Sequence, residues 1–159
     1  MEDPNLRSLM DYALRALARR AHTSHELLVK LRRRANFTEA LGTRVIQRLE
    51  ELKLLNDTEL IKSQLLNAVH YRHQGHLKVA SKLYKKGIPL SQTKAAWVEL
   101  KKSEQLSERE LALAALEKAK KRFQNLPPQK QYQRRAQFLA SRGFSPELTF
   151  ELAKPDESL

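Results

Sequence analysis

The residues of this sequence that could do chemistry are its lysines and arginines, which gather in two stretches that contain no acid. No Asp or Glu lies between Leu60 and Val98, and none lies between Lys118 and Pro146. The first stretch carries seven lysines and arginines, and the second carries eight. A face that serves only solubility usually interleaves both signs of charge. We therefore expect these stretches to bind a polyanion or an acidic protein surface.

Four lysines of the first stretch are predicted to share one face of a helix. They stand at i, i+4, i+7 and i+8: Lys78, Lys82, Lys85 and Lys86. The opposite face carries the apolar residues that we expect to be buried: Val79, Ala80, Leu83 and Tyr84. The alternative is an ordinary solvated helix face, because exposed lysine is common on surface helices. The missing acids favour a basic ridge that binds a partner.

Extending this reasoning to the other basic clusters gives fourteen candidate binding residues: Lys30, Arg33, Arg34, Arg72, Lys78, Lys82, Lys85, Lys86, Lys118, Lys121, Arg122, Arg134, Arg135 and Arg142.

Other kinds of chemistry find little support. The segment HYRHQGH brings His70, His73 and His76 together, but their spacing does not match the two-histidine helix motif and no nearby carboxylate completes a metal shell. Trp97, the single tryptophan, is expected to pack in a core or an interface rather than to stack on bases. There is no phosphate-binding loop, dinucleotide fingerprint or nucleophile elbow. We predict a protein that is not an enzyme and that uses no metal or cofactor.

Composition favours a helical protein of modest size. The 159 residues include 41% hydrophobic and 30% charged residues, with only four glycines and six prolines to punctuate strands. The formal net charge is +12, and the absence of cysteine excludes disulfides. The first ten residues do not resemble a secretory signal, and no apolar run approaches the roughly 20 residues of a membrane span. We expect a soluble cytoplasmic protein.

Apolar spacing and cap residues predict nine helices in three cycles of three. In the first cycle one helix runs from Leu6 to Arg20, the next starts at Thr23 or Ser24 and ends near Asn36, and the third runs from about Thr38 to Leu52. In the second cycle one helix starts at Asn56 or Asp57 and is interrupted by Gly75, the next stops at Gly87, and the third follows Pro89 and reaches Leu100. In the third cycle one helix runs from Ser107 to Phe123, the next follows the LPPQ turn and ends at Gly143, and the last begins at Ser145 and holds Leu152. The second helix of the first cycle has a cap candidate in Thr23 or Ser24. The first helices of the second and third cycles have theirs in Asn56 or Asp57 and in Ser107.

One corner is expected to recur between the second and third helix of each cycle. Its copies are Asn36–Phe37, Gly87–Ile88 and Gly143–Phe144, spaced by 51 and 56 positions, a period typical of stacked helical units. Glycine or asparagine tolerates the left-handed backbone that ends a helix, and the following apolar residue is expected to fill the corner. We predict an all-α fold of three tandem three-helix, helix-turn-helix-like repeats, covering 6–55, 56–105 and 106–154, in an elongated and curved body.

Four segments resemble the bacterial RecX family, the regulatory partners of the RecA recombinase. They are YALRALARRAHTSHELLVKL from residue 12, LLNDTELIKSQL from residue 54, QGHLKVASKLYKKGI from residue 74 and RRAQFLASRGFSPEL from residue 134. The resemblance runs from about Tyr12 to Ala153, and it too implies three tandem three-helix repeats.

The resemblance implies a protein of DNA repair, recombination and the SOS response. Such a protein binds in the groove of the RecA–DNA filament, limits its extension, and lowers its ATPase, strand-exchange and coprotease activities. We expect a monomer that binds the filament and, weakly and without sequence preference, single- and double-stranded DNA. Charge alone favours a different hypothesis, a non-specific DNA-binding protein that competes for DNA. A helical scaffold for some other acidic partner is the third.

Overall fold

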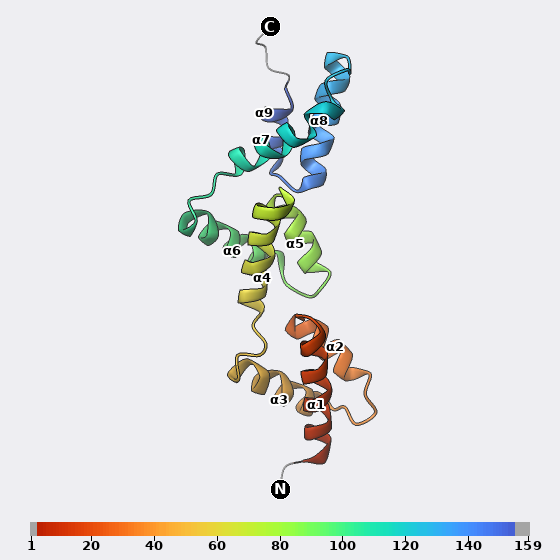
Figure 1. Cartoon of the computed structure of the whole chain (residues 1–159). Helices are drawn as coiled ribbons and strands as arrows, with labels where there is room; N and C mark the ends of the chain where they lie inside the picture. Colours follow the sequence, from red (N-terminus) through yellow and green to blue (C-terminus); the bar gives the residue numbers. More distant parts are fainter. Residues whose placement is uncertain (1–2, 155–159) are drawn as a thin grey trace.

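The structure, a computed structural model, describes residues 3–154, and within them every regular element is helical. Figure 1 shows three groups of helices that follow one another from the N-terminus to the C-terminus. The first group contains α1 (Pro4–Arg19), α2 (Ser24–Arg32) and α3 (Glu39–Glu51). The second contains α4 (Asp57–Asn67), the π-helical turn η1 (Ala68–Arg72), α5 (His76–Tyr84) and α6 (Leu90–Ser103). The third contains α7 (Glu108–Ala119), the 3₁₀ turn η2 (Lys120–Arg122), α8 (Pro128–Arg142) and α9 (Pro146–Ala153).

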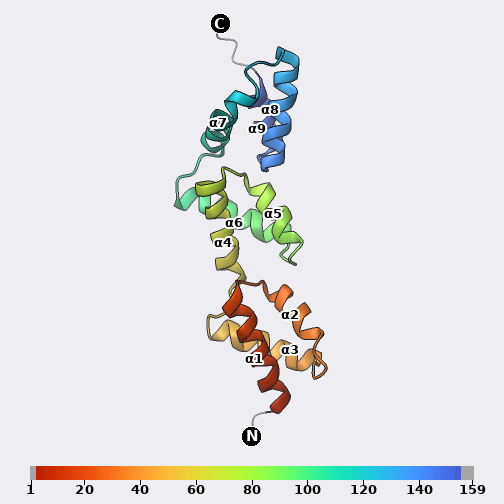
Figure 2. The ribbon, with the colours of Figure 1, turned by 45° about the vertical axis from the view of Figure 1, so that its right-hand side comes forward.

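The three repeats form an elongated body with the chain ends at opposite poles. In Figures 1 and 2 the middle repeat stands to one side of the line through the outer two, so the body is gently curved. The predicted all-α architecture of three tandem three-helix repeats is confirmed. We keep 6–55, 56–105 and 106–154 as the proposed repeat boundaries. No helix in the described part of the chain combines the length and the apolar character needed to cross a membrane.

Each repeat buries its own small hydrophobic core. The first core includes Leu9, Leu27 and Leu49, one residue from each helix of the repeat. The second core is built around Leu65, Leu83 and Trp97, and the third around Leu116, Leu139 and Phe144. A core of this size is modest, so contacts between repeats matter for the stability of the whole body.

Two of the three predicted corners have the expected geometry. Gly87 and Gly143 adopt positive φ angles of 83° and 85°. The apolar residues that follow them, Ile88 and Phe144, are 1% and 2% exposed and fill the corner as predicted. A glycine has no Cβ and therefore adopts this left-handed backbone without strain.

The prediction for Asn36 is wrong. Asn36 is not among the residues of positive φ, and its side-chain amide donates to the carbonyl oxygen of Asn5 at 3.3 Å. Without a glycine the chain leaves α2 through a longer turn, in which Arg34 N and Phe37 N donate to Leu31 O and Arg34 O. The left-handed residues of the first and second repeats instead include Lys53 and Gln105, which follow the ends of α3 and α6.

Two further expectations about the second repeat need correction. The spacing predicts that Tyr84 belongs to the buried stripe of α5, but its side chain is 62% exposed. It is the last residue of α5 and lies at the edge of the buried stripe, one position beyond Leu83, which is 1% exposed. The preceding helix also ends earlier than predicted: α4 stops at Asn67, and the chain widens into η1 before His73 turns it with a positive φ of 47°.

Candidate functional site

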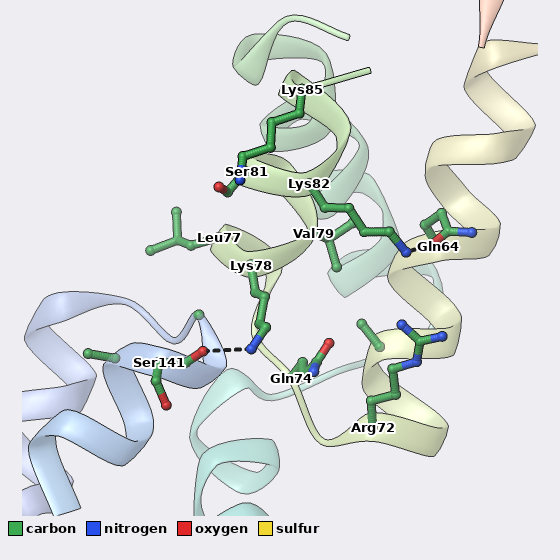
Figure 3. Close-up of a pocket in the computed structure, with 13 residues that line it drawn as sticks. Gln64, Arg72, Gln74, Leu77, Lys78, Val79, Ser81, Lys82, Lys85 and Ser141 are labelled. Atoms are coloured by element: carbon green, nitrogen blue, oxygen red, sulfur yellow. Dashed lines mark hydrogen bonds between the residues drawn. The ribbon is translucent and has the colours of Figure 1, made fainter. Parts of the chain in front are cut away.

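A basic groove opens between the second and third repeats. Its volume is about 600 Å³. Figure 3 shows it bounded by α4, η1 and α5 on one side and by the C-terminal end of α8 on the other. The lining residues are Gln64, Ala68, Arg72, Gln74, Leu77, Lys78, Val79, Ser81, Lys82, Lys85, Ala140, Ser141 and Gly143. We call this feature the inter-repeat groove. Four cations line it and no acid does.

The backbone of the α8–α9 corner caps the start of α5 and so fixes the walls of the groove. Gly75 N donates to Arg142 O at 2.8 Å, and Leu77 N donates to Gly143 O at 3.1 Å. The first N–H groups of a helix have no partner within it, and here the next repeat supplies one. A Cβ on Gly75 would lie 2.2 Å from Gly143 O, so this close approach requires glycine.

Three of the four ridge lysines lie in the groove. Lys78 Nζ donates to Ser141 O at 3.0 Å, and Lys82 Nζ donates to Gln64 Oε1 at 3.3 Å. Lys85 has neither a hydrogen bond nor an ion pair to the residues described, and the same is true of the Arg72 guanidinium. Neutral partners leave the charges of Lys78 and Lys82 uncompensated. The groove therefore presents four positive charges to whatever enters it.

Lys86 lies elsewhere, because α5 ends at Tyr84 and Lys86 no longer follows the helix. Its Nζ is 3.5 Å from Glu26 Oε1, and its carbonyl oxygen accepts a 2.6 Å hydrogen bond from Thr23 Oγ1. Both partners belong to the start of α2 in the first repeat. Lys86 thus joins the first two repeats and does not line the inter-repeat groove.

The two joints between repeats use equivalent positions. The carbonyl that precedes each corner glycine, Lys86 O or Arg142 O, accepts a hydrogen bond from the start of the second helix of the preceding repeat. The first residue of α4 adds a second contact, since Asp57 Oδ1 accepts from Ser24 N at 2.8 Å. At the other joint Glu108, the first residue of α7, lies with its Oε1 3.6 Å from His76 Nδ1.

Acids at these joints have lowered pKa values. Burial works to raise the pKa of Glu108, but the His76 ring and the N–H of Ser145, which donates to Oε1 at 2.9 Å, outweigh it. Burial likewise opposes ionisation of Glu26, but the Arg20 guanidinium, the N–H of Thr23 and the charge of Lys86 lower its pKa overall. Both joints are therefore built for ionised carboxylates.

Replacing Glu108 with glutamine is expected to reduce the free energy of unfolding at neutral pH by about 1–2 kcal/mol, since a charged acceptor makes the stronger hydrogen bond. A lowered pKa contributes stability above the ordinary value of 4.5 and loses it as pH falls through the folded-state pKa. The difference between Glu108→Gln and wild type should therefore shrink well below pH 4.5, as urea unfolding at several pH values would show. The exposed Glu99→Gln is the control, and a pH-independent difference would contradict this account.

The remaining cations of the third repeat surround α8. Arg122 and Arg134 line a second pocket of about 560 Å³ with Phe123, Phe138 and Ser141, and Ser141 also borders the inter-repeat groove. Arg135 lines another cavity beside Lys120, and Lys121 is exposed on η2.

Arg142 and Lys118 contact the second repeat and so stabilise the joint between the second and third repeats. The Arg142 guanidinium donates to Arg72 O at 2.8 Å and lies 5.0 Å from the centre of the Phe138 ring. Lys118 Nζ contacts His73 Nε2. Burial, followed by the charges of Lys118 and Arg142, lowers the pKa of His73.

The cations of the first repeat lie apart from the groove, since α1 and α2 lie at the other end of the body from α8 (Figure 1). Arg34 lies 4.9 Å above the Tyr12 ring, and Arg33 is the exposed cap of α2. Lys30 borders a separate small pocket. The predicted surface is thus split into a groove between the second and third repeats, a neighbouring pocket on α8, and a separate group on the first repeat.

Trp97 and the histidines are the remaining residues singled out in the sequence. Trp97 is 3% exposed and stacks on the His76 ring, with ring centres 5.1 Å apart and planes 9° apart, so its predicted packing role is confirmed. Within residues 3–154, no group of three or more His, Cys, Asp or Glu side chains is arranged to hold a metal ion. Sequence reasoning missed the neutral lining of the groove, Gln64, Gln74 and Leu77. The 43% exposure of the Leu77 side chain becomes evident only in the fold.

Comparison with known proteins gives consistent results. Residues 107–152 match the family model described as RecX, third three-helix domain. The chain is 31% identical over 146 residues to a protein named Regulatory protein RecX from Chlorobium phaeobacteroides (strain BS1), covering 91% of this chain and 90% of that protein. It is 32% identical over 154 residues to the Regulatory protein RecX of Chlorobaculum tepidum, covering 97% and 91%.

Solved structures share the fold. The crystal structure of RecX from Lactobacillus salivarius has a TM-score of 0.78 at 21% sequence identity and covers 93% of this chain and 97% of that one. A crystal structure of regulatory protein RecX has a TM-score of 0.76 at 21% identity, covering 94% and 72%.

Proposed function

The chain belongs to the RecX family of regulatory proteins, and from this we propose that it is a non-enzymatic inhibitor of the RecA recombinase. In this proposal it binds the RecA–DNA filament and limits filament extension, ATPase and coprotease activity. The inter-repeat groove is the surface that meets the filament. Family membership supports the partner, and the charge and shape of the groove support the place of contact.

The single observation that carries the assignment of the surface is the mixed lining of the groove. Its four cations come with no acid, and apolar side chains lie among them, including Leu77 and Val79. Phosphate contacts on DNA need cations and little else, whereas the centre of a protein interface is depleted of charge and enriched in apolar contact. A basic groove with an apolar wall therefore suits an acidic protein surface better than bare DNA.

The pocket on α8 supports the alternative, binding to DNA in competition with RecA. It combines Arg122 and Arg134 with Phe123 and Phe138, and cations beside aromatic rings are typical of single-strand binding. The two rings, however, contact each other edge to face with centres 5.8 Å apart, and Arg142 covers the Phe138 ring. Little ring surface is left for a base to stack upon.

Titrating this protein into the DNA-dependent ATPase of RecA distinguishes the two functions. If the protein acts on the filament, inhibition is expected at concentrations far below that of DNA sites. If it competes for DNA, inhibition requires enough protein to coat the DNA. A requirement for coating would replace the first proposal with the second.

The salt dependence of the two activities provides an independent prediction. If roughly five phosphates of single-stranded DNA are contacted, the log–log salt slope for DNA binding is expected to be about −3.5, since each contact contributes about −0.7. Inhibition of RecA should fall less steeply, because the apolar part of a protein interface is screened little by salt. Both titrations over one chloride series test this, and parallel slopes would show that DNA competition explains the inhibition.

A further inference from the structure

An open aromatic ring, that of Tyr71, projects from the turn η1 beside the inter-repeat groove. Its side chain is 80% exposed, more than any other large apolar side chain within residues 3–154. The His70 ring lies edge to face with it, with centres 6.5 Å apart and planes 71° apart, and no cation of the described residues stacks on it. At least one face of the Tyr71 ring is therefore free to meet a partner.

The backbone that carries Tyr71 is irregular. The turn η1 is π-helical, a rare form that is frequent at functional sites, and it ends at His73, which has a left-handed φ of 47° although it is not glycine. Strained backbone persists only where the surrounding contacts enforce it. The fold does not require such a turn, because α1, the equivalent helix of the first repeat, ends at Arg19 with an extended residue. A single exposed tyrosine is ordinary, but one carried on an enforced, irregular turn is not.

Packing holds the turn in place on both sides of Tyr71. The two residues at its start, Ala68 and Val69, are buried and belong to the core of the second repeat. From the third repeat, the Arg142 guanidinium donates to Arg72 O at 2.8 Å. The backbone at Tyr71 is therefore fixed while its ring is free. A group mounted in this way loses little backbone freedom when a partner covers it.

Uncompensated cations surround the same turn. Arg72, the next residue, lines the inter-repeat groove (Figure 3), and its guanidinium has no partner within residues 3–154. Arg142 and Lys118 reach the turn from the third repeat, and neither forms an ion pair with a described residue. An open ring beside such cations matches the chemistry of a nucleic-acid strand, since bases stack on aromatic side chains and phosphates bind cations.

We infer that Tyr71 is a stacking platform for a base of single-stranded DNA and that Arg72 binds a phosphate of the same strand. The bases of a duplex are already stacked on one another, so an open ring suits a single strand. Tyrosine and arginine are also frequent in protein interfaces, but the centre of such an interface is depleted of charge, whereas three cations surround this ring. The inference does not depend on the proposed action on RecA.

Fluorescence anisotropy of the whole chain with two strands of about twelve nucleotides, within the usual site size, tests the inference. One strand is oligo-dT, and the other is an abasic strand that has the same phosphates and no bases. We expect wild type to bind the dT strand about ten-fold more tightly, because a base gains about this much from stacking on an aromatic ring. Tyr71→Ala should lose most of this preference, and Tyr71→Phe, which keeps the ring, should retain it.

Salt dependence separates the role of the ring from that of the cation. Arg72→Gln should weaken the binding of both strands and make the log–log salt slope shallower by about 0.7, the contribution of one phosphate contact. Tyr71→Ala removes no charge and should leave the slope unchanged. The matched control is Tyr84→Ala, because Tyr84 is also exposed, at 62%, but belongs to the regular helix α5. It should bind both strands as wild type does.

Tyr71→Ala removes an exposed side chain and should fold normally, as circular dichroism would verify. Equal affinity of wild type for the dT and abasic strands would overturn the inference, and so would a dT preference that survives Tyr71→Ala. The RecA ATPase titration covers the remaining alternative, a protein contact. If Tyr71→Ala binds both strands as wild type does but inhibits RecA only at higher concentration, the ring contacts protein and the inference is wrong.

Discussion

Replacing Lys78, Lys82 and Lys85 together with glutamate is expected to abolish inhibition of RecA at the protein concentrations that suffice for wild type. All three lysines line the inter-repeat groove, and no acid there compensates them. Reversing a charge turns each attraction into a repulsion, and three losses of about 1 kcal/mol or more correspond to at least a ~100-fold rise in the inhibitory concentration. The RecA ATPase titration measures this directly.

The matched control is Lys62→Glu/Lys94→Glu/Lys102→Glu. It changes the net charge by the same amount within the same repeat, at exposed positions outside the groove. Lys86 is left unchanged in both variants, because a glutamate there would repel Glu26 and strain the first joint. Helical content and melting should be preserved in both, and Lys78→Gln/Lys82→Gln/Lys85→Gln is a milder substitute should the reversal unfold the chain. Wild-type inhibition by a folded groove variant would contradict the proposed surface.

Substitution of Gly143 by valine is expected to destabilise the protein strongly. The left-handed backbone at φ 85° costs an ordinary residue about 1–2 kcal/mol. A Cβ there would also lie 2.3 Å from Lys78 N, a backbone atom that cannot move without shifting α5. Adding the loss of the hydrogen bonds at this joint, we expect the free energy of unfolding to fall by about 3 kcal/mol or more. Urea unfolding followed by circular dichroism measures it.

Two other glycines separate the contributions. Gly75→Ala has no left-handed strain, since φ is −79°, but its Cβ would meet Gly143 O. It isolates the close approach of the two repeats. Gly87→Ala has the left-handed strain, at φ 83°, and its Cβ would meet the ring and the Cβ of His25. The exposed ring can rotate away, whereas the His25 Cβ, 2.5 Å away, requires a small shift of α2. We expect a smaller loss at Gly87, and His25→Ala should recover part of it. Equal losses for Gly87→Ala and Gly143→Ala would show that the contact with the Lys78 backbone adds little to the left-handed strain.

Much of the fold could be predicted from local sequence because its repeats are made of local signals. Apolar spacing located the nine α-helices found within residues 3–154, and glycine located two corners through its backbone freedom alone. Asn36 misled the prediction because asparagine tolerates the left-handed region but does not require it. The chain leaves α2 through a longer turn instead. Tyr84 misled it because helical spacing does not fix the edge of a buried stripe: Leu83 is 1% exposed, whereas Tyr84 beside it is 62% exposed.

The chemical character of the proposed binding surface was determined by the sequence, whereas its extent was decided by the tertiary structure. The absence of Asp and Glu from a stretch of sequence does not depend on how the helices pack. The basic ridge of Lys78, Lys82 and Lys85 could therefore be predicted from composition and helical spacing. Which cations meet across repeats depends on contacts between residues far apart in the chain. The carbonyl of Arg142 caps α5, 67 positions earlier at Gly75, and this places Ser141 beside Lys78 and opens the groove. The same long-range packing turns Lys86 toward Glu26 and away from the ridge. Local patterns carry no information about such pairings, because nothing in a helix's own sequence specifies which carbonyl of another repeat will meet its unpaired N–H groups.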